Sequence, residues 1–159
     1  MELSDCIERQ FSGASQWSEA SIEEALRGIP ELRELASPLA TDPEAGHAYG
    51  RNVVYADERI EAIVVHLPPG AATAVHDHGR SVGCAIVLEG RMTNETYRVE
   101  ASGKARRIET ATHEAGQWMR SPAGVVHRMR NDGAERLVSL HVYAPPLRGM
   151  RRYDAETER

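Results

Sequence analysis

Three histidines are the residues of this chain best suited to chemistry. His76 and His78 lie in the segment GAATAVHDHGRSVG, and His127 lies in SPAGVVHRMRN. Side chains alternate between the two faces of a strand, so His76 and His78 can face one interior while Asp77 points outward. Imidazole binds iron, zinc, copper and nickel. The pattern therefore predicts a metal site without fixing the metal.

The overall composition limits the classes to which the protein can belong. Its 159 residues suggest one domain, and its two cysteines, Cys6 and Cys84, do not suggest a disulfide framework. Nineteen basic residues against 24 acidic ones give a net charge of −5, so we expect no nucleic-acid partner. No run approaches the roughly 18 apolar residues of a membrane span, and the first residues do not resemble a signal peptide. We therefore expect a cytoplasmic protein with no membrane partner.

The first third of the chain, residues 1–46, has the pattern of short helices. Ser21 and Glu24 have the spacing of a capping box, followed by a helical rhythm of apolar residues. Pro30 can begin a further helix, because proline is favoured at the first helical position.

From Tyr49 onward the pattern is typical of β-strands. Pro68, Pro69 and Gly70 end the first strand, and Gly90 is the centre of a hairpin-like turn between the second and third. Many short strands separated by turns favour a sandwich or a barrel. The predicted strands are residues 60–67, 82–88, 92–99, 104–110, 117–120, 125–130 and 137–143.

The two histidine segments resemble, spacing for spacing, the paired metal-binding motifs of the cupin superfamily. The resemblance implies one all-β structural domain: a cupin jelly-roll barrel over residues 49–150, N-terminal helices over 1–48 packed on it, and a charged tail over 151–159. Most cupins carry a glutamate five residues after the second histidine, where this chain has Gly83. Three neutral imidazoles would leave a ferrous ion at its full charge, which favours an anionic ligand such as a thiolate.

Four segments carry a closer resemblance to the cysteine dioxygenase (type I) family of cupins. They are YGRN from Tyr49, the run around His76 and His78, PAGVVHR around His127, and SLHVYAPP from Ser139. The resemblance implies a mononuclear non-haem Fe(2+) site that oxidises a thiol to a sulfinic acid with both atoms of O2. It assigns the iron to His76, His78 and His127.

The same resemblance implies roles for five further residues. Ser139, His141 and Tyr143 match a hydrogen-bonded relay whose tyrosine hydroxyl faces the substrate and the iron. Alternation along one strand puts these three side chains on the same face. Arg51 matches the arginine that binds the substrate carboxylate, and Tyr49 matches a tyrosine that assists it. A guanidinium fits a carboxylate in two places, which a lysine does not.

Two departures are similar to the bacterial branch of the family. In the mammalian branch a cysteine is linked to the relay tyrosine, and its position is Gly83 here. Cys84, one residue later, faces away on a strand, so we expect a small apolar core residue and an unmodified Tyr143. Met150 stands where the mammalian branch has another cysteine lining the pocket.

The resemblance therefore implies a thiol dioxygenase that converts L-cysteine to cysteine sulfinic acid, with a small-molecule thiol and O2 as its partners. Other carboxylated thiols, 3-mercaptopropionate and mercaptosuccinate, stay open as substrates. Arg148, Arg151 and Arg152 could supply a second carboxylate contact. Further alternatives are a non-catalytic cupin that binds a small molecule and a zinc or manganese cupin of the isomerase type.

Overall fold

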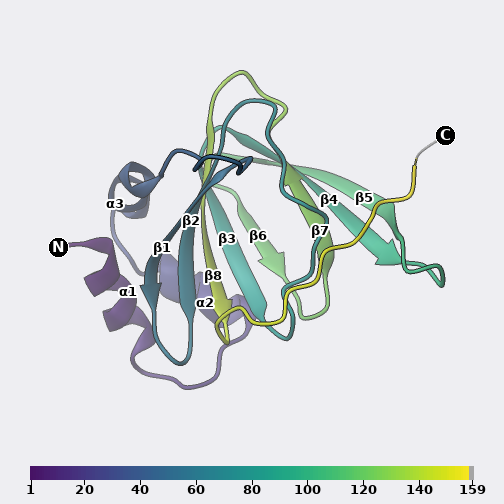
Figure 1. The fold of residues 1–159 in the computed structure, drawn as a ribbon. Helices are drawn as coiled ribbons and strands as arrows, with labels where there is room; N and C mark the ends of the chain where they lie inside the picture. The colour runs from purple at the N-terminus through teal and green to yellow at the C-terminus, as the bar shows by residue number, and fades with distance from the viewer. Residues whose placement is uncertain (158–159) are drawn as a thin grey trace.

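The computed structural model describes residues 1–157 and arranges them in three layers (Figure 1). Helices cover one face of a five-stranded sheet, and a three-stranded sheet faces its other side. No helix within residues 1–157 is long and apolar enough to cross a membrane. The helical elements are α1 Leu3–Phe11, α2 Glu19–Arg27, α3 Leu32–Ala36 and the 3-10 helix η1 Ser37–Leu39.

Two helix starts differ from the prediction. The Ser18 hydroxyl accepts from the Ser21 N–H at 3.1 Å, and the Ser21 hydroxyl accepts from the Ser18 N–H at 2.8 Å. The capping box therefore lies one turn before the predicted pair of Ser21 and Glu24, because a second serine satisfies the same two donors. Pro30 does not begin α3: Glu31 follows it in the left-handed conformation, at φ 56°, and the helix starts at Leu32.

The described strands form two sheets that face one another as in a jelly roll. Their orders are β1-β2-β8-β3-β6 and β5-β4-β7, and the hydrogen bonding between the named strands does not join the two sheets into a closed barrel. The predicted strands are present, with ends shifted by a few residues. The bounds are β1 Gly50–Ala56, β2 Glu61–Leu67, β3 Val82–Glu89, β4 Arg91–Val99, β5 Ala105–Glu114, β6 Trp118–Ser121, β7 Val126–Arg130 and β8 Leu137–Ala144.

The predicted hairpin around Gly90 is wrong. β3 pairs with β6 and β8, whereas β4 pairs with β5 and β7, so the chain crosses from one sheet to the other at this residue. Gly90 has φ 78°, and a Cβ there would lie 2.4 Å from the carbonyl oxygen of Arg136. A hairpin turn and a crossing between two sheets both place glycine at a sharp turn where backbones approach closely. The sequence pattern therefore did not distinguish the hairpin from the crossing.

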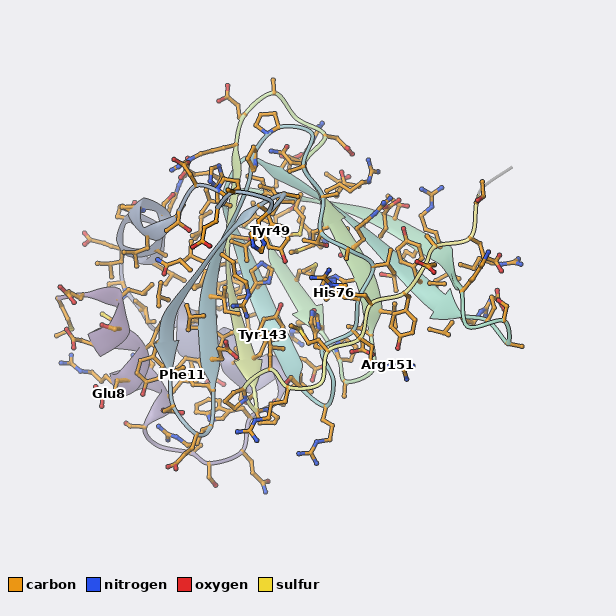
Figure 2. The ribbon with its side chains drawn as sticks, viewed as in Figure 1. Glu8, Phe11, Tyr49, His76, Tyr143 and Arg151 are labelled. Carbon is orange, nitrogen blue, oxygen red and sulfur yellow. The ribbon has the colours of Figure 1, made fainter. Side chains whose placement is uncertain are left out.

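Strand β8 is buried along its whole length because it has a layer on each side. Val138, Leu140 and Val142 pack toward the helices, in the same cluster as Phe11 of α1. The alternate residues, including Tyr143, face the space between the sheets. Figure 2 shows this separation, with Phe11 beside the helices and Tyr143 near the middle of the molecule.

Residues 75–77 run beside residues 151–153 at the opening between the sheets, and residues 154–156 continue along Ala105 of β5. Isolated bridges join His76 to both His127 and Arg152, and another joins Ala105 to Ala155. The two histidines predicted on a strand therefore lie in an irregular segment held by single bridges. We call residues 151–156 the strap; of the predicted charged tail, residues 158–159 lie outside the described part of the chain.

Candidate metal centre and pocket

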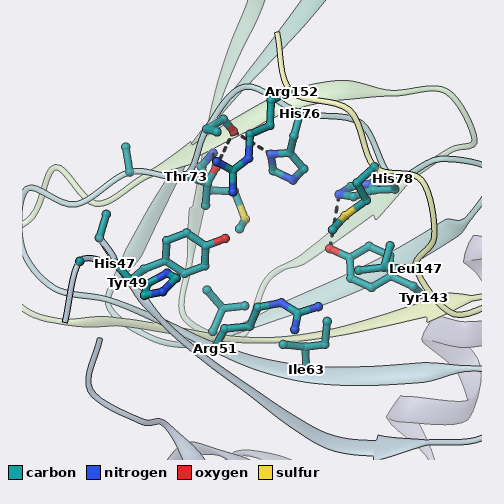
Figure 3. Close-up of a pocket in the computed structure, with 17 residues that line it drawn as sticks. His47, Tyr49, Arg51, Ile63, Thr73, His76, His78, Tyr143, Leu147 and Arg152 are labelled. Atoms are coloured by element: carbon teal, nitrogen blue, oxygen red, sulfur yellow. Dashed lines mark hydrogen bonds between the residues drawn. The ribbon is translucent and has the colours of Figure 1, made fainter. Parts of the chain in front are cut away.

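A cavity of about 480 Å³ opens between the two sheets and beneath the strap (Figure 3). Five of the eight predicted site residues line it: Tyr49, Arg51, His76, His78 and Tyr143. The other three lie directly behind this lining: His127 Nε2 is 3.1 Å from His78 Nε2, and His141 is hydrogen-bonded to both Ser139 and Tyr143. A volume of this size is typical of a small-molecule site.

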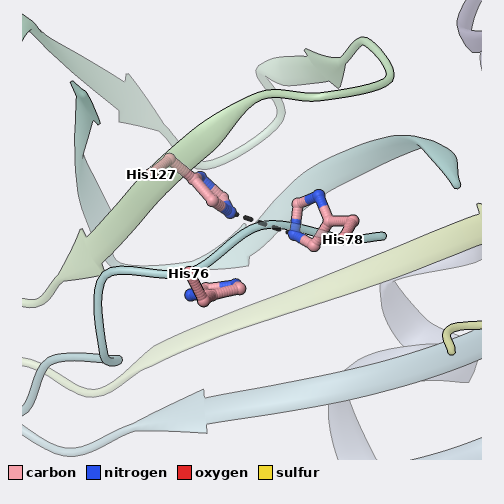
Figure 4. Close-up of side chains that lie close together, drawn as sticks. All are labelled: His76, His78 and His127. Carbon is pink, nitrogen blue, oxygen red and sulfur yellow. Dashed lines mark hydrogen bonds between the residues drawn. The ribbon is translucent and has the colours of Figure 1, made fainter. Parts of the chain in front are cut away.

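The three motif histidines converge at one end of the cavity (Figure 4). One ligand nitrogen of each lies within 4.8 Å of the other two, and the Nε2 atoms of His78 and His127 are 3.1 Å apart. Two nitrogens that each lie about 2.1 Å from one ion are separated by about 3.0 to 3.4 Å, from octahedral to tetrahedral angles. The spacing of this pair therefore fits two ligands of one metal ion.

Hydrogen bonds on the far side of two rings leave their Nε2 atoms free to act as ligands. His76 Nδ1 lies 2.7 Å from the Ala74 carbonyl oxygen, and His127 Nδ1 lies 2.8 Å from Asn94 Oδ1. Each Nδ1–H donates to its oxygen, which fixes the tautomer and presents the Nε2 lone pair. His78 Nδ1 is buried and has no hydrogen-bond partner among the described residues.

The histidines are also neutral, as metal ligands must be. Burial lowers the pKa of His78 to about 4, and the charge of His76 adds to this effect. Burial also lowers the pKa of His76 and holds that of His127 well below its ordinary value. The donor set, its spacing and its protonation therefore fit a divalent metal ion bound by three neutral imidazoles.

Asp77 anchors the segment that carries two of these histidines. Its Oδ1 accepts hydrogen bonds from the backbone N–H groups of Gly79 and Arg151, both at 3.0 Å. Its Oδ2 accepts from the Tyr153 hydroxyl at 2.8 Å. These contacts turn the carboxylate away from the histidines and tie their segment to the strap.

Ser139, His141 and Tyr143 form a continuous hydrogen-bonded chain along β8. Ser139 Oγ lies 2.7 Å from His141 Nε2, and the Tyr143 hydroxyl lies 3.2 Å from His141 Nδ1. The same hydroxyl lies 3.5 Å from His78 Nε2, at the metal end of the cavity. The alternation expected for a strand therefore brings the chain of three side chains to the histidine cluster.

Arg51 enters the cavity from β1 on the opposite side. Its guanidinium lies 3.6 Å from Glu61 Oε2, too far for a hydrogen bond, so its donors stay available to a ligand. Tyr49 stands beside it in the lining. Five larger apolar side chains also line the cavity: Ile63, Val65, Met129, Leu147 and Met150.

Gly83 lies against the ring of Tyr143. The two residues are partners in the β3–β8 register, and a Cβ on Gly83 would lie 2.7 Å from Tyr143 Cδ1. Cys84 faces the other way, into the cluster beneath the helices. Burial raises the pKa of the Cys84 thiol to about 12, as suits a core residue and not a nucleophile.

Two contacts in this site had no local signal in the sequence. Asn94 holds His127 from the neighbouring strand β4, and that pairing joins segments distant along the chain. Of the three arginines considered for a second carboxylate contact, Arg152 lines the cavity, whereas Arg148 and Arg151 do not. The sides that Arg151 and Arg152 face depend on how the strap pairs with the segment around His76.

Solved structures from several organisms resemble this chain. TT1209 from Thermus thermophilus is 27% identical, over 69% of this chain and 93% of that one, with a TM-score of 0.57. An uncharacterized conserved protein with a double-stranded β-helix domain from Klebsiella pneumoniae is 22% identical, over 75% and 88%, with a TM-score of 0.62. The oxalate decarboxylase of Lactobacillus farciminis is 21% identical, over 70% and 33%, with a TM-score of 0.57. The Klebsiella pneumoniae and Lactobacillus farciminis proteins are less than 25% identical to this chain, and these two matches show a shared fold alone.

A family comparison covers the whole site. The sequence model of cysteine dioxygenase type I matches residues 40–156, from the segment before β1 to the strap. This range contains the three histidines, Arg51 and the chain of hydrogen bonds on β8. The protein belongs to the cysteine dioxygenase type I family.

Proposed function

We propose that this protein is a thiol dioxygenase that oxidises L-cysteine to cysteine sulfinic acid with O2. The observation that carries the proposal is one cavity in which three neutral imidazoles, the Tyr143 hydroxyl and the Arg51 guanidinium converge. His76, His78 and His127 would hold Fe(2+). The two cysteines are unlinked, which supports a reducing compartment such as the cytoplasm.

Ferrous iron, when bound, supplies the Lewis acidity and redox chemistry through which a thiol and dioxygen react. The three imidazoles contribute no negative charge. A substrate thiolate is therefore attracted to the full charge of the cation.

Arg51 binds the substrate carboxylate in this proposal. Its donors point into the cavity and are not consumed by Glu61, so a two-pronged contact with a carboxylate is available. Tyr49 stands in the lining beside it. Holding the carboxylate here and the sulfur at the histidines orients the substrate, which is the main contribution a protein makes to such a reaction.

Tyr143 donates a hydrogen bond to the reacting atoms. Burial raises the pKa of Tyr143, so its hydroxyl keeps its proton at neutral pH. Burial lowers the pKa of His141 to about 3, so its ring is neutral and has one donor and one acceptor nitrogen. In this proposal His141 is protonated at Nδ1: the Ser139 hydroxyl then donates to His141 Nε2 over 2.7 Å, His141 Nδ1–H donates to the Tyr143 oxygen over 3.2 Å, and the tyrosine proton is left to face the cavity.

The test is an anaerobic reconstitution with Fe(2+), followed by measurement of oxygen uptake and sulfinate formation. L-Cysteine, 3-mercaptopropionate and mercaptosuccinate are compared in parallel. We expect one sulfinate for each O2 consumed. Absence of sulfinate from all three thiols, in protein that retains its iron, would contradict the proposal.

Tyr143→Phe tests the hydrogen-bonded chain on β8 without changing the three histidines. It removes the hydroxyl and keeps the ring against Gly83. We expect kcat to fall about 10- to 100-fold with the iron content unchanged. His127→Ala is the matched comparison and should lower the iron content itself.

A further inference from the structure

The cavity contains a second arginine that the proposed reaction of L-cysteine does not use. Arg152 lines the same cavity as Arg51, and Figure 3 shows the two side chains entering it from opposite sides. Arg51 has Glu61 nearby, whereas Arg152 has no carboxylate partner within residues 1–157. Among the described lining residues there is no aspartate or glutamate.

The backbone on both sides of Arg152 is fixed, so its direction is built into the fold. The Asp77 N–H donates to the Arg151 carbonyl oxygen at 3.0 Å, and the Tyr153 N–H donates to the Val75 carbonyl oxygen at 2.9 Å. Arg152 itself forms a bridge with His76. The strap is therefore paired to the histidine segment, one residue before and one residue after Arg152.

Alternation along the extended strap sends Arg152 into the cavity and its neighbours away from it. The Arg151 guanidinium lies over the Tyr153 ring, 5.8 Å from its centre. The Tyr153 hydroxyl donates to Asp77, on the side away from the histidines. Neither Arg151 nor Tyr153 lines the cavity.

The charges in the cavity match a substrate with more than one anionic group. A divalent metal, Arg51 and Arg152 would present three cationic centres around one small volume. A thiolate with a single carboxylate leaves one guanidinium without a partner. Both arginines are partly open to water, so an unpaired guanidinium costs little there, and the second arginine adds attraction for a second anionic group.

We infer that Arg152 forms a second anion subsite, and that the enzyme prefers small thiols that carry two acidic groups. The inference rests on the proposed dioxygenase function. One acidic group binds Arg51, the other binds Arg152, and the sulfur reaches the histidines between them. The reaction is R–SH + O2 → R–SO2H: two S–O bonds form, the O–O bond breaks, sulfur loses four electrons and dioxygen gains four. The proton stays with the sulfinic acid, and no external reductant is required.

The experiment compares mercaptosuccinate, which has two carboxylates, with L-cysteine in the iron-loaded protein and in two variants. Arg152→Gln removes the charge in the cavity. Arg151→Gln removes the same charge from the next residue, which faces away, and serves as the matched control. Anaerobic calorimetry of mercaptosuccinate binding gives a readout independent of turnover.

In wild-type protein we expect a higher kcat/KM for mercaptosuccinate than for L-cysteine. Arg152→Gln should reduce this preference about tenfold or more, and should raise the Kd for mercaptosuccinate by a similar factor, because a hydrogen bond to a charged group is lost. Arg152→Lys should keep part of the preference, and Arg151→Gln should keep all of it.

The outcomes separate this inference from the proposed function. If L-cysteine is oxidised but mercaptosuccinate is not preferred, or if Arg152→Gln weakens both substrates equally, the second subsite is refuted and the dioxygenase stands. If Arg151→Gln has the same effect as Arg152→Gln, the effect is a general loss of positive charge, which also refutes the subsite. If no thiol is oxidised, the proposed function itself fails.

Discussion

Glu95→Gln should destabilise the part of the fold that carries His127, with a defined dependence on pH. Glu95 lies on β4, and its side chain is 1% exposed. Arg107 donates to its Oε2 at 2.8 Å, and Arg128 donates to its Oε1 at 2.8 Å from Nε. Arg130 Nε also donates to Glu95 Oε1, at 3.1 Å. One buried carboxylate therefore joins one arginine of β5 and two arginines of β7.

The size of the effect follows from the pKa of this carboxyl group. Burial alone would raise the pKa of Glu95, but hydrogen bonds from Arg107 and Arg128 and the charges of Arg128 and Arg130 outweigh it and lower the pKa from 4.5 to about 2. At 1.36 kcal/mol per pH unit, this difference sets a ceiling of about 3 kcal/mol. The arginine side chains are about one-third exposed and partly screened, so we expect a loss of about 2 kcal/mol.

The sign of the pH dependence follows from the lowered pKa. A carboxyl group with a lower pKa in the folded protein stabilises fully above its unfolded pKa, near 4.5, and loses this contribution as the pH falls toward about 2. Denaturant unfolding of wild type and Glu95→Gln should therefore differ by a constant amount from pH 6 to 8. The difference should shrink below pH 4.5.

Glu109→Gln is the control, because Glu109 is an exposed carboxylate on the adjacent strand β5 and its loss changes the net charge equally. Asn94, which holds His127, is the neighbour of Glu95, so Glu95→Gln should also retain less iron than wild type at neutral pH. Equal stability of the Glu95 and Glu109 variants at pH 7, or a difference that grows as the pH falls from 4.5 to 3, would refute this reasoning.

Three further predictions concern the cavity. Gly83→Ala places a Cβ 2.7 Å from the Tyr143 ring, so kcat should fall at least tenfold while iron content, measured by metal analysis, is retained; unchanged kcat would contradict the placement of the ring. Arg51→Gln should raise the KM for L-cysteine at least tenfold at unchanged iron content, because a two-pronged contact is lost, and a fall in iron content would contradict its role. Intact mass should match the unmodified sequence, since Cys84 faces the helices and a link to Tyr143 would remove two hydrogens.

The histidine motifs and the chain on β8 have signals in the sequence itself, from the family's motif spacing and from strand alternation, and the structure brings the three histidines together. The alternation of Ser139, His141 and Tyr143 puts all three on one face of any strand, whatever its neighbours. The Gly90 turn was not predictable in this way. A glycine between two apolar strands has the same pattern in a hairpin and in a crossing between sheets, and only pairing with distant strands distinguishes the two.

The strap shows the same limit for a binding residue. Arg148, Arg151 and Arg152 are equivalent in the sequence, and the bridge between His76 and Arg152 decides which of them enters the cavity. A bridge of one residue pair has no periodicity from which it could be predicted. Asn94 was missed for the same reason, since its contact with His127 depends on the register between β4 and β7.

Substitutions on β8 and substitutions in residues 147–152, on two sides of the cavity, should differ in how strongly they disturb the fold. Tyr143 and the two residues behind it belong to β8, which is buried on both faces, so a substitution there disturbs the core as well as the hydrogen bonds. Arg152 and Met150 lie on exposed chain after β8, and their side chains can change without repacking either sheet. We therefore expect substitutions in residues 147–152 to change which thiol is preferred, and substitutions on β8 to change the rate with every thiol.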